Sequence, residues 1–246
     1  CAISPDGSAV AFTYKGDIYT VPTTGGTARQ LTTNAAYDTH PVWSPDSKQL
    51  AFCSNREGSM DVYVMQREGG TPRRLTTNSN SETPIAFKDN NTVLYTSSII
   101  PSAKSIIFAN RMLPQVYEVG TNGSRPHLFS ALPMMDISIR PNGDLLYHDQ
   151  KGYEDPWRKH HRSPITRDIW LRRGDKYTKL TNFNGEDRTP VWAAQGDTFY
   201  YLSEEDGTFN VYMRNIDGTG KQQLTRHTTN PVRFLTAANN GTLCYG

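Results

Sequence analysis

Hydrophobic and polar residues alternate in short runs along the whole chain, and no stretch keeps the 3.6-residue period of an amphipathic helix. Runs such as Leu50-Ala51-Phe52 and Val62-Tyr63-Val64 are rich in the residues that strands prefer. Turn sequences such as Pro5-Asp6-Gly7 and Gly69-Gly70 stand between the runs, because proline presets φ and glycine supplies positive φ. The pattern predicts an all-β chain of short antiparallel strands.

Three sequence marks recur in one order, which indicates internal repeats. The first mark, Ala2-Ile3-Ser4-Pro5-Asp6-Gly7, returns 40 residues later as Val42-Trp43-Ser44-Pro45-Asp46-Ser47. The second mark is an acid or amide before a β-branched and an aromatic residue: Asp17-Ile18-Tyr19, Asp61-Val62-Tyr63, Gln115-Val116-Tyr117, Asp168-Ile169-Trp170 and Asn210-Val211-Tyr212. The third mark, a leucine followed by hydroxyl residues, comes 12 to 14 positions later: Leu31-Thr32, Leu75-Thr76, Leu128-Phe129-Ser130, Leu180-Thr181 and Leu224-Thr225.

Each repeat predicts four short strands within about 40–45 residues, which is the signature of a β-propeller blade. Six first strands but five third strands can be counted, so we predict a six-bladed β-propeller of four-stranded antiparallel blades whose sixth blade is incomplete. The expected blades of this single domain cover residues 1–34, 40–78, 83–130, 136–182, 189–227 and 230–246. Half a blade leaves an unpaired strand edge, so we interpret the chain as a piece excised from a longer protein.

Composition narrows the class of protein. The 246 residues include 13 Tyr, 9 Phe and 4 Trp, enough aromatic side chains to pack a core. A net charge of +2 gives no general reason to expect nucleic acid as a partner, and no apolar run approaches the roughly 18–20 residues of a membrane span. Three cysteines are too few and too scattered for a disulfide framework.

The chain lacks the standard catalytic signatures. It has no Gly-x-Ser-x-Gly elbow, His-Glu-x-x-His, phosphate-binding glycine loop or Cys-x-x-Cys, so we expect no catalytic residue and no cofactor. The first-turn acids Asp6, Asp46 and Asp89 are interpreted as acceptors of local backbone N–H bonds. We interpret Glu204-Glu205-Asp206 as a solvated loop. Adjacent side chains of an extended segment point opposite ways, so we expect no metal site at His160-His161.

Two adjacent repeats carry insertions at the same connection. From the second-strand aromatic to the third-strand mark there are 20 residues in the third repeat and 21 in the fourth, against 5 to 9 in the others. Neighbouring long loops on one face are where propellers place binding surfaces. The first insertion, which holds Phe108 and Arg111, is unusually apolar. It either folds onto its own core or meets a partner.

The second insertion is basic and aromatic. Residues 151–173 hold seven Lys and Arg against three Asp and Glu, a net charge of +4. Such a patch would steer a peptide carboxylate or an acidic partner surface, while a contact with another domain or subunit is the alternative. The candidate binding residues here are Tyr153, Trp157, Arg158, Lys159, His160, His161 and Arg162. The two histidines titrate near neutrality and would tune the patch with pH.

Longer segments resemble known families. The unit from Ser44-Pro45-Asp46-Ser47 to Arg73-Arg74-Leu75-Thr76 resembles the WD40-like repeats of TolB-type propellers. Residues 152–161, with 166–170 and 185–192, resemble the N-terminal six-bladed propeller of tricorn-type serine proteases. This second resemblance implies a non-catalytic domain of a large, usually oligomeric peptidase whose nucleophile lies in a separate C-terminal domain.

The resemblances imply the role and the partners. A tricorn-type domain would serve peptide access or filtering, or the docking of domains and subunits, with the peptidase part, peptides or other proteins as partners. The TolB resemblance implies an alternative, a periplasmic protein-interaction module with no peptidase attached. We expect a periplasmic location, with the cytoplasm as the alternative. An enzyme inside the propeller channel would need converging His or carboxylate residues, and the six histidines occupy no matched blade positions.

Overall fold

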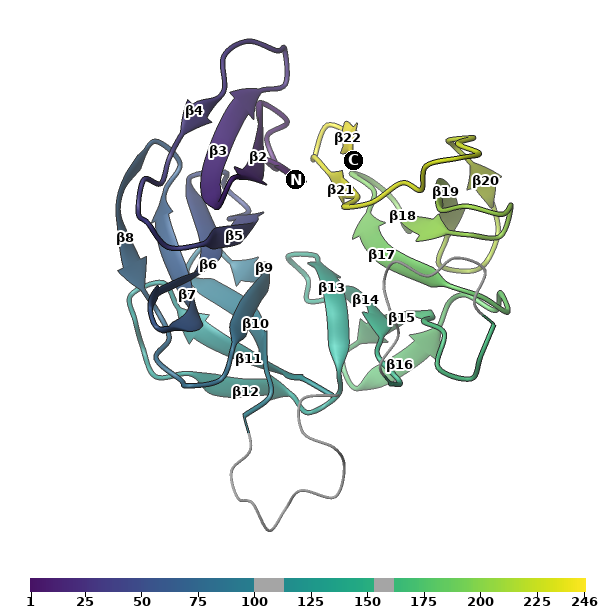
Figure 1. Cartoon of the computed structure of the whole chain (residues 1–246). Coiled ribbons are helices and arrows are strands. Elements are labelled where there is room, and N and C mark those ends of the chain that lie inside the picture. The colour runs from purple at the N-terminus through teal and green to yellow at the C-terminus, as the bar shows by residue number, and fades with distance from the viewer. Residues whose placement is uncertain (100–112, 153–161) are drawn as a thin grey trace. The chain divides into compact units, whose positions relative to one another are not determined.

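The computed structural model describes residues 1–99, 113–152 and 162–246 (Figure 1). These residues form strands and turns and no helix, which confirms the all-β prediction. None of them therefore supplies an apolar helix long enough to cross a membrane. The strands make five four-stranded antiparallel sheets and one two-stranded sheet, so the chain is a propeller of four-stranded blades. The prediction of six blades is corrected to five, because the residues after 230 supply only two paired strands.

Two compact units divide the chain, Cys1–Leu132 and Pro133–Gly246, and each is described by itself. The first unit holds blades one to three. Blade one is made of β1 (Ala2–Ile3), β2 (Ala9–Tyr14), β3 (Asp17–Pro22) and β4 (Arg29–Gln30). Blade two is made of β5 (Asp38–Trp43), β6 (Gln49–Glu57), β7 (Ser59–Gln66) and β8 (Gly69–Arg74), and blade three is made of β9 (Glu82–Asp89), β10 (Thr92–Ser97), β11 (Gln115–Gly120) and β12 (His127–Ser130). The second unit holds blades four and five and one further strand pair. Blade four is made of β13 (Met134–Ile139), β14 (Leu145–Asp149), β15 (Ile169–Arg173) and β16 (Lys176–Lys179). Blade five is made of β17 (Asp187–Trp192), β18 (Thr198–Ser203), β19 (Asn210–Asn215) and β20 (Gln222–Gln223), and the further pair is β21 (Thr236–Ala237) with β22 (Leu243–Cys244). That one domain spans the whole chain stays a prediction.

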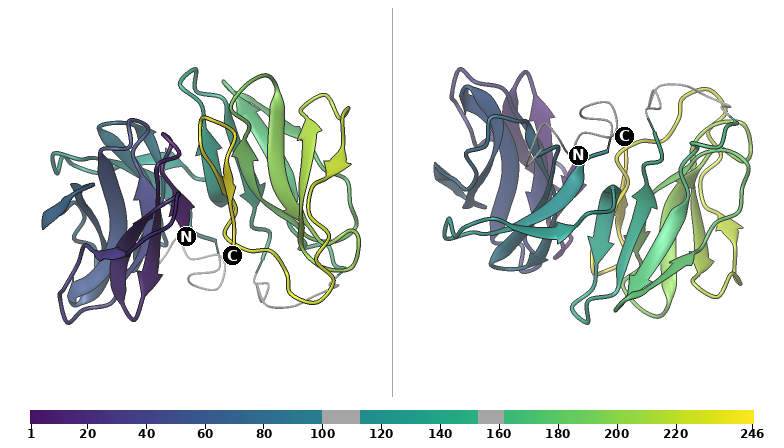
Figure 2. Two further views of the ribbon diagram at one scale, coloured as in Figure 1. Left: turned by 90° about the horizontal axis from the view of Figure 1, so that it is seen from above. Right: turned by 90° about the horizontal axis from the view of Figure 1, so that it is seen from below.

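Consecutive strands pair within every blade, so each blade is a simple antiparallel meander (Figure 2). The turn acids behave as predicted in the first unit. Asp6 Oδ1 accepts a hydrogen bond from Ser8 N at 2.9 Å, and Asp46 and Asp89 accept equivalent bonds from the residue two positions on. These carboxylates close the first turn of their blades and are structural.

The first strands of blades two, four and five each contain a β-bulge that the sequence marks do not predict. His40, Asp136 and Thr189 have φ of 55°, 48° and 51°, and the strand register shifts next to each of them. A bulge inserts one extra residue into the strand and increases its twist. Non-glycine residues rarely adopt positive φ, so the surrounding ladder holds these three in place.

Apolar side chains pack between the faces of consecutive blades within each unit. In the first unit, Ile18 of blade one packs with Phe52 and Tyr63 of blade two, and all three are buried. In the second unit, Ile169 of blade four packs with Tyr201 of blade five. The pair β21 and β22 covers the next face of blade five through Leu235 and Leu243.

The second and third sequence marks are joined by one recurring hydrogen bond. The hydroxyl of the threonine in the third mark accepts the backbone N–H just after the acid of the second mark, in the pairs Thr32 with Ile18, Thr76 with Val62, Thr181 with Ile169 and Thr225 with Val211, at 3.0, 2.9, 3.0 and 2.9 Å. This contact explains the nearly constant offset between the marks. The leucine and threonine follow the fourth strands instead of forming them, except in blade three, where the mark lies within β12.

Candidate functional site

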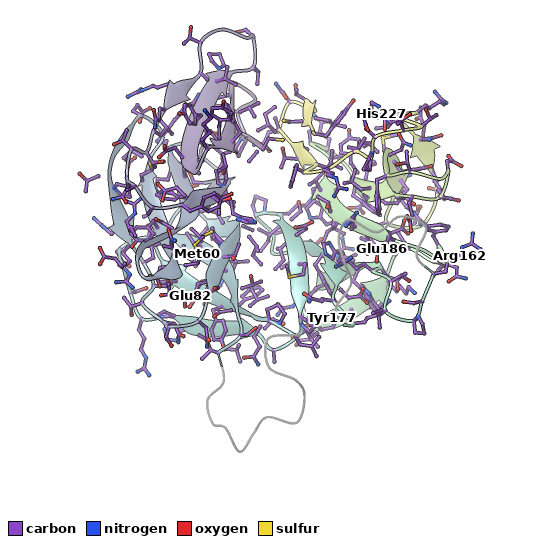
Figure 3. The ribbon with its side chains drawn as sticks, viewed as in Figure 1. Met60, Glu82, Arg162, Tyr177, Glu186 and His227 are labelled. Carbon is purple, nitrogen blue, oxygen red and sulfur yellow. The ribbon has the colours of Figure 1, made fainter. Side chains whose placement is uncertain are left out.

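The two insertions leave the blades at the predicted connections. One lies between β10 and β11, and the other lies between β14 and β15. Most of the predicted binding residues fall outside the described residues: Phe108, Arg111, Tyr153, Trp157, Arg158, Lys159, His160 and His161. Arg162 is described, and its side chain is exposed (Figure 3). The base of the second insertion can therefore be built from its flanking residues.

Charged side chains tie together the two ends of the second insertion. The Lys151 Nζ atom lies 2.5 Å from Asp168 Oδ2 and 3.5 Å from Asp149 Oδ2, and it donates to the Thr166 carbonyl at 2.7 Å. Asp149 Oδ1 accepts the backbone N–H of Asp168 at 2.8 Å. Burial alone would lower the pKa of Lys151, but the hydrogen bond and charges of the two aspartates raise it above its ordinary value. The result is a charged platform, made of Lys151, Asp149 and Asp168, that joins the described residues flanking 153–161.

Three of the described bases of residues 151–173 are paired with carboxylates. Lys151 is neutralised by Asp168, and Arg167 Nη1 lies 3.2 Å from Glu186 Oε2. Arg173 pairs with Asp144 at 2.7 Å and ends β15, four strand residues or about 13 Å from the insertion. Arg162, in the same connection, is exposed.

A second charged residue, missed by the sequence reasoning, completes the platform. Lys179 at the end of β16 places its Nζ atom 2.9 Å from Asp168 Oδ2, so two lysines flank a carboxylate that is 5% exposed. A buried carboxylate is stable when it is paired and hydrogen-bonded, and Asp168 meets both conditions. The sequence marked Asp168 as a strand-opening acid, but nothing in the pattern pointed to Lys179.

Two buried glutamates, Glu186 and Glu204, lie between the platform and blade five. Glu186 is 4% exposed, and its backbone N–H donates to Glu204 Oε1 at 3.2 Å (Figure 3). Burial raises the pKa of Glu186, and the neighbouring Arg167 opposes that rise. Glu204 is 4% exposed as well, so the interpretation of residues 204–206 as a solvated loop is wrong for its first member. The backbone donor inside the protein compensates that carboxylate.

His148 of β14 is a buried neutral histidine that contacts β17 of blade five. Thr189 donates its backbone N–H to His148 Nδ1 at 3.3 Å and its hydroxyl to Asp136 Oδ2 at 2.7 Å. Because Nδ1 accepts a hydrogen bond, the ring carries its proton on Nε2. Burial lowers the pKa of His148 to about 4, although Asp136 opposes the shift. The group supports the bulged strands and offers no free base.

The described residues form four-stranded antiparallel blades and no helix, and the ends of the second insertion are joined by a charged platform. The chain is a β-propeller domain. It matches the family described as the tricorn protease N-terminal beta propeller domain over residues 2–246, and it belongs to that family.

Known relatives agree with this family. The chain is 29% identical over 228 residues to tricorn protease homolog 1 of Streptomyces coelicolor, a match that covers 91% of this chain and 20% of the relative. The chain thus spans about a fifth of the length of that relative. The crystal structure of the tricorn protease superimposes with a TM-score of 0.79 at 18% identity, over 97% of this chain and 23% of that one.

A TolB structure shares the fold too. The putative TolB from Agrobacterium tumefaciens superimposes with a TM-score of 0.72 at 16% identity, over 100% of this chain and 88% of that one. At such identities the structural likeness concerns the fold alone. The resemblances to tricorn-type and TolB-type propellers that the sequence motifs indicated are confirmed.

Proposed function

We propose that this chain is a non-catalytic propeller domain of a tricorn-like serine peptidase, acting in peptide access or filtering or in the docking of domains and subunits. The observation that carries the proposal is the family match, which runs over residues 2–246. The absence of standard catalytic signatures from the sequence agrees with it. The peptidase activity of the parent protein is part of the proposal.

The insertion edge is the proposed working surface. The Lys151–Asp168–Lys179 group supports this choice, because it anchors both ends of the second insertion to blade four. A binding loop held at its base loses less conformational entropy when a partner docks. The exposed guanidinium of Arg162 at the same edge suits an anionic partner, such as a peptide carboxylate or an acidic protein surface.

Two alanine substitutions test the working surface. We expect Trp157→Ala and Arg158→Ala, made in the full-length protein, to alter peptide cleavage or assembly while the circular dichroism spectrum stays unchanged. Arg172→Ala is the matched control, because Arg172 lies on β15 toward the end opposite the insertion. If cleavage rate and assembly size both stay normal in the two test variants, the assignment of this edge is wrong.

The second candidate function is a TolB-like protein-interaction module without a peptidase. The superposition on 88% of the putative TolB chain favours it, since that protein is little longer than this propeller match. The intact mass of the natural protein separates the two candidates. A mass several times that of this chain supports the peptidase, and a mass less than twice as large supports the module. The periplasmic location stays a prediction, and cell fractionation tests it.

A further inference from the structure

A half-open pocket of about 380 Å³ lies within the second unit, between blades four and five. One wall is the link that follows β16, residues 181–184, and the other is the face of blade five. Its charged and aromatic lining comes from Asp187, Tyr201, Glu205, Arg214 and Lys221. The volume lies in the range of small-ligand sites.

Two lining groups of opposite charge have unused hydrogen-bonding capacity. The Asp187 Oδ1 atom and the Arg214 Nε atom are both buried, and neither has a hydrogen-bond partner. The Asp187 residue is 2% exposed. Buried polar groups without partners are rare in native proteins and are costly, because their lost hydration is not replaced. Both residues line the pocket, so these two unpartnered atoms point to a ligand that supplies a donor and an acceptor there.

The register of Arg214 is filled differently in different blades. It stands two residues after the aromatic residue of its second mark, where blade two has Met65, blade three has Val119 and blade four has Arg172. Met65 and Val119 are 3% and 1% exposed and pack in apolar clusters between blades. In blade five the arginine at this register lines the pocket, and in blade four the arginine does not. A guanidinium at this register thus lines this pocket only in blade five among these four described blades.

The remaining charges of the lining cancel each other. Lys221 Nζ forms an ion pair with Glu205, and both side chains are about two-fifths exposed at the mouth of the pocket. This leaves the Asp187 carboxyl and the Arg214 guanidinium to recognise the charged ends of a ligand. Burial raises the pKa of Asp187 to about 6, which indicates a carboxylate that would gain from a cationic partner.

We infer that this pocket binds a small zwitterion of amino-acid or dipeptide size, with its carboxylate on Arg214 and its ammonium group on Asp187. A guanidinium matches a carboxylate through charge-assisted hydrogen bonds, and a buried carboxylate does the same for an ammonium group. The site is separate from the insertion edge, so the inference does not rest on the proposed function.

Glycylglycine and two capped forms of it test the inference on the full 246-residue chain. Isothermal titration should show saturable one-to-one binding of glycylglycine. N-acetyl-glycylglycine, which lacks the ammonium group, and glycylglycinamide, which lacks the carboxylate, should each bind about tenfold more weakly or worse. Affinity for glycylglycine should also rise with pH through about 6, as Asp187 ionises.

Variants assign the binding to this pocket. Arg214→Met installs the residue that blade two uses at this position, and it should weaken glycylglycine binding about tenfold or more. Arg172→Met is the matched control, because Arg172 occupies the same register in blade four and does not line the pocket. Equal affinity of the two variants would overturn the site. No saturable binding of glycylglycine, or equal affinity for the capped peptides, would overturn the ligand, and the capped-peptide comparison needs no variant to fold.

Discussion

Glu82 at the start of β9 and Asp61 of β7 are buried carboxyl groups of neighbouring blades, and the charge of Asp61 acts on the ionisation of Glu82 (Figure 3 labels Glu82). Both residues are almost fully buried, and Arg74 Nη2 lies 2.7 Å from Asp61 Oδ2 on the other side. Burial, reinforced by the charge of Asp61, raises the pKa of Glu82 to about 7. The arginine keeps Asp61 in place as the charged partner.

Glu82→Gln should remove part of the pH dependence of stability. The folded-state pKa lies above the ordinary value of 4.5, so the stabilisation is complete below pH 4.5 and is lost as the pH rises to about 7. The loss is about 3 kcal/mol of unfolding free energy. The amide does not titrate, so the variant should be free of this loss over that window. Urea unfolding between pH 4 and 8 measures this, with Glu68→Gln on the exposed surface as the control. A wild-type slope in the Glu82→Gln curve would contradict the raised pKa of Glu82.

His148→Asn should have the opposite effect. The pKa of His148 is lowered from 6.5 to about 4, so its contribution is present above pH 6.5 and is lost as the pH falls toward 4. Asparagine keeps an acceptor for the Thr189 N–H and does not titrate. Because the Glu82 and His148 effects oppose each other, His148→Asn should lose stability as the pH rises, and Glu82→Gln should gain it. His127→Asn, at an exposed position, is the control. Parallel curves for all variants would refute the two assignments.

Thr76→Val tests the hydrogen bond that recurs in four blades. Valine preserves the shape of the side chain but leaves the buried Val62 N–H without the acceptor that it has at 2.9 Å. An unsatisfied buried donor costs about 1–3 kcal/mol. Thr76→Ser keeps the oxygen and should cost less than half as much. Chemical unfolding at constant pH compares the two, and equal losses would mean that the methyl group, not the hydrogen bond, is what matters.

The local architecture could be predicted because it repeats. Each second mark lies in or directly before a third strand, and the Thr76–Val62 bond and its equivalents give the marks their constant spacing. Blade number was harder, because counting first strands does not show whether the strands that follow them pair. The residues after 230 pair only as β21 with β22.

The candidate site depended on information that a linear pattern lacks. Net charge over residues 151–173 already includes Asp168, the partner of Lys151, but it misses the carboxylates that the fold brings to Arg167 and Arg173. Two of these partners, Asp144 and Glu186, lie outside that stretch of sequence. The role of Arg214 could not be predicted either, because blade four has Arg172 at the same register and only the fold shows which of the two arginines lines a pocket.

Asp168→Asn should destabilise the second unit at the base of the insertion. The substitution keeps the size of the side chain but leaves Lys151 and Lys179 without the carboxylate that they share. The Lys151 and Lys179 side chains are 32% and 40% exposed and can regain some water, so the expected loss is about 2 kcal/mol.

Asp17→Asn is the matched control for this change. Asp17 holds the same position in blade one, but its partners are the neutral side chains of Gln30 and Thr32. Thermal unfolding should therefore show a clearly larger drop for Asp168→Asn, and the gap between the two variants should narrow at high salt, because added ions screen the lysine charges in either state. Equal drops that do not respond to salt would show that Asp168, like Asp17, acts only through neutral hydrogen bonds, and the charged platform that joins the ends of the insertion would have to be abandoned.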